Sequence, residues 1–391
     1  MANVLCIYEN KISTVSLTEN FFEETANYDN NFNYRFVSIL KLKKSDLEYC
    51  DVLYMIRPNN HVFGRIAKIA KKSGITVVYY IDDDLLHLPL GIVDIPWRKK
   101  GASIAAKESD IIVSSSQYIC DSYRKKFNIS RSVTIDTAVP SKDIKPHLNE
   151  KNDRIKIVYA AGIAHKELFD KYIKPVLKDI DIYCGKKISL TFMGVHPELN
   201  EADYSFPIIY IDSLPLSEYR KRIEQENFDI GLAPLVTNDF TKCKYYNKFI
   251  EYAMFGIVGL YSDTEPYTFV VNDKENGILV GNSPKNWLNA ICSVVNNEEL
   301  VKKCRNNIYN TLKERFDQTI ITNSLFQNIP ELIGIHKDKR LSGILLSFVK
   351  TQYRFSRFAD WLYKFGFYYK KEGFKGVISG IKRKLHSYRV G

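Results

Sequence analysis

Short apolar runs alternate with amphipathic stretches over two long parts of the chain. In the first part, apolar and β-branched runs predict five strands, at residues 4–8, 52–56, 76–81, 110–115 and 133–136. The stretch at 63–74 repeats its apolar positions at helical spacing and ends on Gly74, which predicts a helix that stops at this glycine. Strands and helices that alternate in this way are typical of a parallel sheet built from βαβ units.

The second part of the chain repeats the same alternation. Its apolar runs predict strands at residues 155–160, 188–193, 208–211, 229–234, 257–262 and 277–280. Residues 138–154 are polar, contain prolines and lack periodicity, which predicts a linker between the two parts. The fold class is therefore α/β, with two Rossmann-like doubly wound domains that face a cleft.

The expected boundaries follow from this division. The chain joins the two domains near residue 145, and a basic, aromatic, helical extension follows them. The four expected segments are 1–145 for the N-terminal domain, 150–316 for the C-terminal domain, 317–335 for a helix that returns to the N-terminal domain, and 336–391 for the extension.

Composition narrows the class of protein. With 391 residues, 45% hydrophobic and 26% charged, the chain is globular, which excludes a disordered, collagenous or disulfide-stapled protein. Its seven cysteines are widely spaced without a CxxC pair, so we expect reduced thiols and no structural zinc. The first residues lack the charged segment and following apolar run that would predict a signal peptide. No apolar run reaches the ~18 residues that a membrane span needs.

The net charge of +11 is concentrated at the C-terminus. Residues 331–391 contain 14 Lys and Arg against 4 Asp and Glu, which leaves a charge of only +1 for residues 1–330. Any electrostatic attraction to a polyanionic partner therefore belongs to the last sixty residues.

Candidate chemistry follows the strands, because ligands of doubly wound domains bind where strand carboxyl ends meet helix amino ends. The acidic run Asp82, Asp83 and Asp84, with His87, comes after the strand at 76–81. The alternative for this run is a solvated turn that caps a helix. Gly162 and His165 follow the strand at 155–160, where small residues let backbone amides approach a phosphate. A tight turn without a ligand is the alternative there.

The strongest local pattern lies at 238–267. It predicts a helix from Lys244 to Phe255 that ends at Gly256, with Lys244, Lys248 and Glu251 on one face. Two lysines there can neutralise a diphosphate, and the carboxylate can accept hydrogen bonds from both hydroxyls of a ribose. A solvated helix surface with one i,i+3 ion pair is the alternative.

These segments together resemble the donor-binding domain of GT-B glycosyltransferases, close to glycosyltransferase family 4 and to the bacterial enzymes that build surface polysaccharides. The resemblance covers about 155–316 and rests on YAAGIAHKEL, LTFMGVHPE, the run from DIGLAP to DTEPY, and ENGILVGN. In the first domain it rests on VVYYIDDDLL and the rhythm of the strands.

The resemblance implies transfer of a sugar from a nucleotide-sugar donor to a glycan or lipid-linked acceptor, without a cofactor or an essential metal. Glu251 matches the second glutamate of the family's paired-glutamate motif and is expected to bind the ribose. Cys243 occupies the position of the first glutamate, eight residues earlier. Lys242, Lys244 or Lys248 are expected to stabilise the diphosphate with the Gly162 turn.

The first domain is expected to be the acceptor side, with Asp82–Asp84 and His87 positioning the acceptor or acting as general base. Asp82–Asp84 formally contains a DxD pair, so a bound metal is the alternative there. Rival functions on the same fold are a nucleotide-sugar 2-epimerase, a glycerophosphotransferase of wall-polymer synthesis and a noncatalytic scaffold.

The extension at 341–391 interleaves basic and aromatic residues. This pattern predicts an interfacial helix on an anionic membrane surface, and therefore a cytoplasmic protein at the inner face of the cell membrane. The same composition suits single-stranded nucleic acid, but no nucleic-acid fold accompanies it, so nucleic acid is not an expected partner. The remaining alternative is a packing or oligomer element.

Overall fold

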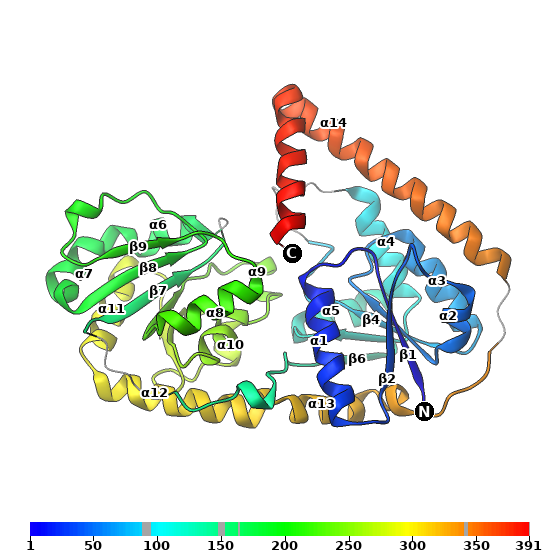
Figure 1. The fold of residues 1–391 in the computed structure, drawn as a ribbon, viewed down its shortest axis with the longest axis horizontal. Coiled ribbons are helices and arrows are strands. Elements are labelled where there is room, and N and C mark those ends of the chain that lie inside the picture. The colour runs from blue at the N-terminus through cyan, green and yellow to red at the C-terminus, as the bar shows by residue number, and fades with distance from the viewer. Residues whose placement is uncertain (88–94, 148–152, 163–164, 340–342, 391) are drawn as a thin grey trace. The chain divides into compact units, whose positions relative to one another are not determined.

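The structure is a computed structural model that describes residues 1–87, 95–147, 153–162, 165–339 and 343–390. The chain divides into two compact units (Figure 1). Unit 1 comprises Met1–Ala138 and Gln318–Gly391, and unit 2 comprises Val139–Asp317. The expected second domain begins at residue 150, which lies outside the described residues.

Unit 1 is built on a parallel six-stranded sheet with the order β2-β1-β3-β4-β5-β6. Its strands are β1 (Asn3–Tyr8), β2 (Asn33–Ser38), β3 (Val52–Ile56), β4 (Thr76–Tyr80), β5 (Ile111–Ser114) and β6 (Arg131–Thr134). The helices are α1 (Ser13–Tyr28), α2 (Lys44–Tyr49), α3 (His61–Lys72), α4 (Pro96–Lys107), α5 (Gln117–Phe127), α13 (Gln318–Asn328) and α14 (Gly343–Val390). The central strands are buried on both faces, so they are continuous apolar runs.

One strand of unit 1 has no counterpart among the predicted ones. β2 pairs with β1 at the edge of the sheet, and its burial alternates between exposed and half-buried positions. The exposed residue Arg35 of β2 forms an ion pair with Asp46, with Nη1 3.0 Å from Oδ1. An edge strand of this kind lacks the continuous apolar run that identified the central strands. β6 also begins two residues before the predicted position.

Unit 2 is built on a second parallel six-stranded sheet with the order β12-β11-β10-β7-β8-β9. All six strands were predicted: β7 (Ile155–Ala160), β8 (Ile188–Met193), β9 (Ile208–Ile211), β10 (Ile230–Ala233), β11 (Val258–Ser262) and β12 (Ile278–Val280). The helices are α6 (Lys166–Tyr172), α7 (Leu177–Cys184), α8 (Leu216–Glu226), α9 (Asp239–Lys242), α10 (Asn247–Ala253), α11 (Pro284–Val295) and α12 (Glu298–Thr311). The predicted α/β class with two doubly wound domains is confirmed.

α13 belongs to unit 1, although it follows unit 2 in the chain. It packs against α1 through a buried polar contact: Gln318 Nε2 donates to Thr25 Oγ1 at 3.1 Å, and the hydroxyls of Thr25 and Thr322 lie 3.2 Å apart. Leu325 and Phe326 enter the apolar core that covers this face of the sheet. The two stretches of unit 1 thus share one core.

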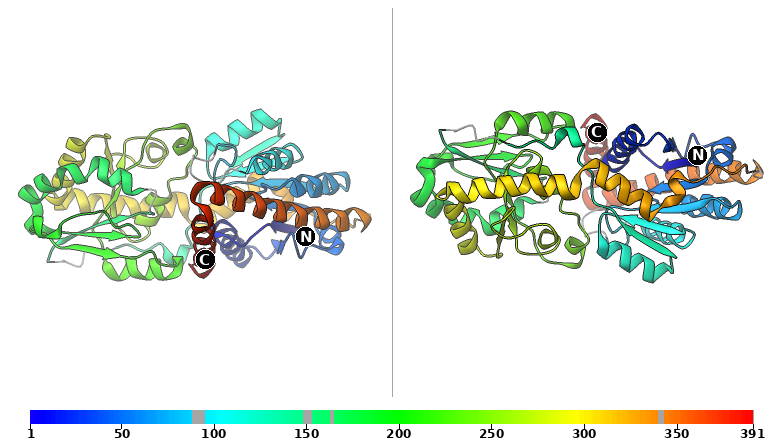
Figure 2. Two further views of the ribbon diagram at one scale, coloured as in Figure 1. Left: turned by 90° about the horizontal axis from the view of Figure 1, so that it is seen from above. Right: turned by 90° about the horizontal axis from the view of Figure 1, so that it is seen from below.

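α14 runs along unit 1 and contacts α3 (Figure 2). Its buried residues Val349, Tyr353, Ser356 and Asp360 recur at i, i+4, i+7 and i+11, so they form one face of the helix. The helical backbone is interrupted at Gly373, whose φ of 61° favours glycine. Among the described residues, no helix is both long and apolar enough to cross a membrane.

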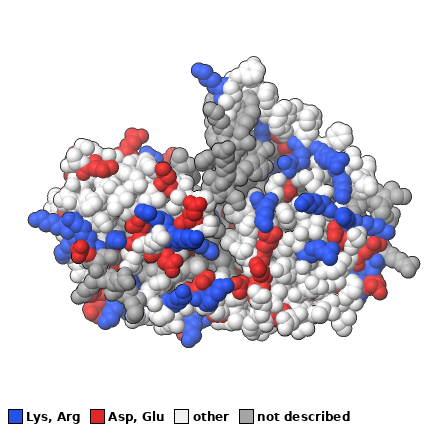
Figure 3. Space-filling view, viewed as in Figure 1, with Lys and Arg blue, Asp and Glu red and all other residues white. Residues whose placement is uncertain are grey.

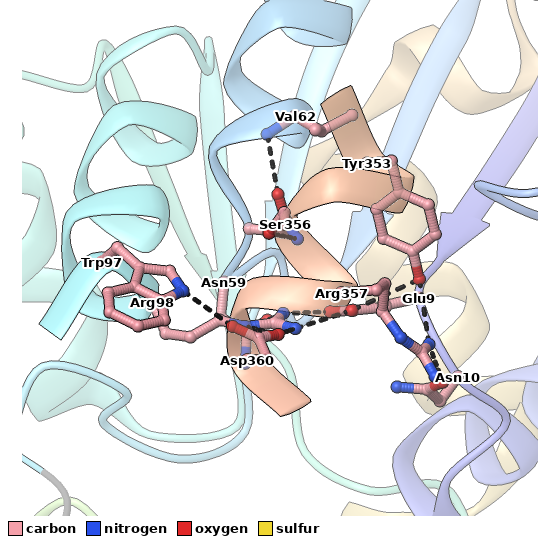
Figure 4. A network of polar contacts seen from close by, with 11 residues as sticks. Glu9, Asn10, Asn59, Val62, Trp97, Arg98, Tyr353, Ser356, Arg357 and Asp360 are labelled. Carbon is pink, nitrogen blue, oxygen red and sulfur yellow. Dashed lines mark hydrogen bonds and ion pairs between the residues drawn. The ribbon is translucent and has the colours of Figure 1, made fainter. Parts of the chain in front are cut away.

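Buried charges attach this face of α14 to unit 1 (Figure 4). Asp360 accepts hydrogen bonds from Trp97 Nε1 at 2.7 Å and from Arg98 Nε at 2.9 Å. The Arg98 guanidinium also donates to Glu9 Oε1 at 2.8 Å, and Glu9 accepts from the Tyr353 hydroxyl. Because one guanidinium serves two carboxylates from distant parts of the chain, this network joins α14 to β1 and α4.

Candidate active site

Three polar side chains meet on α8 and α10 of unit 2. Lys248 Nζ donates to both carboxylate oxygens of Glu251, at 2.7 and 2.9 Å, and the Tyr219 hydroxyl donates to Glu251 Oε1. Burial, and then the Glu251 charge, raise the pKa of Tyr219 well above its usual range, so the phenol stays protonated. The Glu251 carboxylate is therefore oriented from two sides, and its side chain is about one quarter exposed.

His165 follows β7, and its burial and the charges of Lys244 and Lys248 shift its pKa. Burial, and then Lys244 and Lys248, lower its pKa to about 4, so the imidazole is neutral at pH 7. Its backbone carbonyl accepts a hydrogen bond from the Tyr159 hydroxyl at 2.7 Å, and its amide donates to the Gly162 carbonyl at 2.9 Å. Gly162 is exposed, and open space surrounds the position a Cβ would take there.

The expected single helix from Lys244 is wrong in its first three residues. α9 ends at Lys242, and α10 begins only at Asn247 after Tyr246, whose ψ of 48° is not helical. Tyr245 and Tyr246 are both buried with ring centroids 4.0 Å apart, so their packing sets the break. Lys242 and Lys244 thus lie before α10, and only Lys248 and Glu251 share its surface.

Cys243, at the position of the first glutamate in the family motif, is buried at the end of α9. Its Sγ lies 3.2 Å from the Asp239 carbonyl oxygen. A thiol there cannot supply the charged acceptor that a carboxylate would offer to a sugar hydroxyl.

Hydroxyl and amide side chains fix the loop that leads from β10 to α9. Ser262 Oγ accepts the Leu235 amide hydrogen at 2.8 Å and lies 2.6 Å from Asn282 Oδ1, while Asn282 Nδ2 donates to the Leu235 carbonyl at 2.8 Å. The hydroxyls of Thr237 and Thr264 are 2.7 Å apart. These contacts join the carboxyl ends of β10, β11 and β12, and they hold the chain that carries the lysines.

The acidic run of unit 1 is organised by Arg57, which follows β3 with a φ of 47°. Its guanidinium lies 3.3 Å from Asp82 Oδ1 and 3.1 Å from Asp83 Oδ2. The Thr14 hydroxyl donates to Asp82 Oδ2 at 2.6 Å. Burial raises the pKa of Asp82, while Arg57 opposes this shift. Asp82 and Asp83 are therefore engaged within the protein.

Asp84 faces a different environment and forms a dyad with His87. Its buried carboxylate accepts hydrogen bonds from the Leu86 amide at 3.0 Å and the Tyr123 hydroxyl at 3.1 Å, and it lies 2.6 Å from His87 Nδ1. Because a carboxylate accepts hydrogen bonds, His87 Nδ1 is the donor in this contact, and in the neutral ring Nε2 is then the acceptor. The His87 side chain is 65% exposed, so this nitrogen is accessible to a ligand.

The sequence reasoning missed several residues of these clusters, among them Arg57 and Tyr219. Arg57 occupies the position directly after a predicted strand, which is the place where ligand-binding residues of this fold class are sought. Tyr219 stands in a polar helix, and its contact with Glu251 depends on two helices that are 32 residues apart in the chain. The first residue could have been found from strand position, and the second could not.

The comparisons with known proteins are structural. No protein-family model and no curated protein matches the sequence. The fold is similar to Anabaena Alr3699/HepE solved with UDP and glucose, with a TM-score of 0.58 and 11% identity over 84% of this chain and 100% of that one. Sucrose-phosphate synthase from Thermosynechococcus elongatus aligns with a TM-score of 0.57 and 10% identity over 85% and 99% of the two chains. The lipopolysaccharide outer core galactosyltransferase WaaB aligns with a TM-score of 0.55 and 15% identity over 84% and 99%.

These similarities define the class of fold. The two Rossmann-like units have the GT-B fold, as the sequence resemblance implied. At this level of identity the similarity concerns the fold, and the closer assignment to family 4 stays a prediction.

Proposed function

We propose that this chain is a glycosyltransferase that transfers a sugar from a nucleotide-sugar donor to an acceptor. The observation that carries the proposal is the group formed by Glu251, Lys248, Tyr219 and His165 at one end of unit 2. An oriented carboxylate beside cations and a neutral imidazole is suited to a ribose attached to a diphosphate. Among the solved structures of similar fold, Anabaena Alr3699/HepE was crystallised with UDP and with UDP-glucose, which supports a nucleotide-sugar donor.

In this proposal the residues of unit 2 bind the donor. Glu251 accepts hydrogen bonds from the ribose hydroxyls, and Tyr219 keeps its carboxylate in place. Lys244 and Lys248, with Lys242 and the exposed backbone at Gly162, stabilise the diphosphate as it leaves and gains charge. The anomeric carbon develops oxocarbenium character, so catalysis depends on holding both the leaving group and the acceptor hydroxyl.

The residues after β4 of unit 1 serve the acceptor. His87 presents an accessible Nε2, and Asp84 holds the opposite side of the ring. This arrangement suits an acceptor hydroxyl that donates a hydrogen bond to the imidazole and transfers its proton as the new bond forms. Asp82 and Asp83 then act through Arg57, by fixing the turn that carries the dyad.

A melting experiment with a panel of nucleotides and nucleotide sugars tests the donor proposal. A ligand present at 100 times its dissociation constant adds ~2.7 kcal/mol to the free energy of unfolding, which appears as a rise in melting temperature. We expect uridine diphosphate, or another nucleoside diphosphate, to stabilise the wild type and to have much less effect on Glu251→Ala. Absence of any shift across the panel would remove the basis of the proposal.

We further propose that α14 binds an anionic membrane and that the acceptor is a lipid-linked glycan of a cell-surface polysaccharide. Rings on the face of α14 opposite its buried face form a row in which Phe358 and Trp361 lie 6.1 Å apart, Trp361 and Phe365 5.7 Å, and Phe365 and Tyr369 6.2 Å. All four rings are exposed. Lys and Arg side chains gather along the course of this helix (Figure 3). Aromatic rings at the acyl boundary with cations on the headgroups are typical of interfacial helices.

Sedimentation with liposomes tests the membrane proposal. Replacing Phe358, Trp361 and Phe365 together by Ser should release the full chain from phosphatidylglycerol vesicles, and high salt should release the wild type. The matched control replaces Ile182 and Tyr183 by Ser, because these apolar residues of α7 are also exposed but belong to unit 2. Equal sedimentation of both variants and the wild type would contradict a membrane role for α14.

A further inference from the structure

A basic pocket also lies in unit 1, and none of the three aspartates after β4 is among its lining residues. It is an open pocket of about 560 Å³ at the carboxyl ends of β1 and β2, and the loop before α2 and one residue of α14 complete it. Its lining includes three lysines, Lys41, Lys43 and Lys350. The carboxyl edge of a parallel sheet is where doubly wound domains place their ligands, so the position favours binding.

The charge of this pocket is positive because its one described acid is already engaged. Asp46 pairs with Arg35 at 3.0 Å, and its other oxygen accepts the Lys43 backbone amide hydrogen at 2.8 Å. The charge of Asp46 is thus balanced by Arg35, which is not a lining residue. Its hydrogen bond with the Lys43 amide fixes the start of α2. The three lysines remain as an excess of positive charge in a concave site, where their fields add.

The other lining residues are apolar, except for Ser38. Tyr8, Phe36, Val37 and Leu40 line the pocket beside the lysines, and Leu40 is half exposed. A free inorganic anion would use only the lysines and would leave this apolar surface in water. A ligand that joins a phosphate to an apolar or amphipathic body covers both, and the volume accommodates a headgroup larger than a phosphate ion.

We propose that this pocket binds the phosphate of an amphiphile, either a phospholipid headgroup or the phosphate of a lipid-linked acceptor. The inference rests on the proposed function, since it names the part of the acceptor or membrane that unit 1 holds. Lys350 belongs to α14, so the helix that carries the exposed aromatic row also contributes one residue to the pocket. A phosphate in the pocket therefore fixes the docked half of α14 to the edge of the sheet while the outer face meets the bilayer.

The test uses the full chain and two soluble probes that distinguish the two sources. Dihexanoyl phosphatidic acid represents a phospholipid, and a short-chain alkyl diphosphate that carries a sugar represents a lipid-linked acceptor. Titration calorimetry should detect binding of at least one probe, and the probe that binds more tightly identifies the source. Dihexanoyl phosphatidylcholine, whose headgroup has no net charge, should bind on the order of tenfold more weakly than the acid.

Charge reversal locates the site. Lys41→Glu combined with Lys350→Glu should weaken the tighter probe on the order of tenfold or more. The matched control, Lys44→Glu combined with Lys68→Glu, makes the same charge change in unit 1 at two residues outside the lining and should retain binding. Failure of both probes to bind the wild type, or equal weakening by both pairs of substitutions, would overturn the proposal.

The uridine diphosphate melting shift is measured on the same proteins and separates this inference from the proposed function. Both double variants should keep the wild-type shift, because the four lysines belong to unit 1 and the proposed donor residues to unit 2. A wild type that binds the amphiphile but no nucleotide would count against the proposed donor and leave the pocket standing. A wild type that binds nucleotide but neither amphiphile would count against the pocket alone.

Discussion

The turn after β4 in unit 1 and the surface of α10 in unit 2 carry different charges, and the two units hold these charges in different ways. In unit 2, burial and then the charges of Lys244 and Lys248 keep His165 neutral, and the carboxylate of Glu251 is paired with Lys248. In unit 1, three successive aspartates follow β4, and Arg57 neutralises part of their charge. In the proposed function, the cluster of unit 2 meets an anion and the cluster of unit 1 meets a hydrogen-bond donor.

The comparison also shows that neighbouring residues of one type need not share a role. Asp82 and Asp83 face Arg57, whereas Asp84 is buried and contacts His87 and Tyr123. In unit 2, Lys248 pairs with Glu251, while Lys244 lies before the helix above the Phe240 ring, with Nζ 5.3 Å from its centroid. In the proposed function, each cluster divides into groups that meet the ligand and groups that position them.

The largest effect is expected from removing the cations of unit 2. Replacing Lys244 and Lys248 by Ala should lower turnover about a thousandfold and raise the donor's Michaelis constant less, because the leaving diphosphate gains charge in the transition state. Steady-state kinetics measures both quantities. Chelation by EDTA should have little effect. Full inactivation by EDTA, with recovery on adding Mg²⁺ or Mn²⁺, would transfer the role of the lysines to a metal.

Glu251→Ala should weaken nucleotide binding about a hundredfold, because hydrogen bonds to a charged group contribute ~1.5–3 kcal/mol each. Titration calorimetry with uridine diphosphate gives the change. Glu218→Ala is the matched control, since Glu218 is an exposed acid on α8, and it should bind as the wild type does. Unchanged binding by Glu251→Ala would refute the ribose assignment, and a collapse in melting temperature would indicate a structural role instead.

Most of the fold could be predicted from the sequence because buried parallel strands are continuous apolar runs. β7, β8 and β9 were predicted to the residue. β2 escaped because an edge strand with exposed Asn33 and Arg35 lacks that signal. The start of α10 escaped because buried Tyr245 and Tyr246 break a pattern that local periodicity would continue.

The candidate site was only partly accessible to the same reasoning. Strand ends and helix spacing identified the acidic run and Glu251, since these signals are local. The partners of these residues come from distant segments: Arg57 from β3, Tyr123 from α5 and Tyr219 from α8. Such pairings depend on tertiary packing. The three aspartates are neighbours in the sequence, so the sequence alone could not show that two of them pair with Arg57 and the third with His87.

The division of the aspartates predicts unequal effects of equal substitutions. Asp84→Asn should lower turnover about tenfold or more, because the amide cannot hold the Nδ1–H tautomer of His87 as the carboxylate does. Asp83→Asn should have a smaller effect, since Asp82 still contacts Arg57. The pH dependence of turnover distinguishes positioning from general destabilisation, because a misoriented catalytic ring changes the shape of the pH profile whereas a loss of folded protein only scales it. Equal losses in both variants, without a change in the pH profile, would contradict the division.

The smallest expected effect is a change in the titration of His165, and it tests whether the two lysines of unit 2 act on this imidazole. Its pKa of about 4 lies below the ordinary value of about 6.5, so folding favours the neutral ring. The resulting stability is complete above pH 6.5 and is lost as the pH falls from there toward 4. Replacing Lys244 by Ala should raise the pKa, and bound uridine diphosphate should raise it too, because its charge offsets the lysines. The imidazole signal in NMR spectra recorded across this pH range measures each shift directly. If neither change moves the pKa, burial alone sets it, and the lysines do not face the ring.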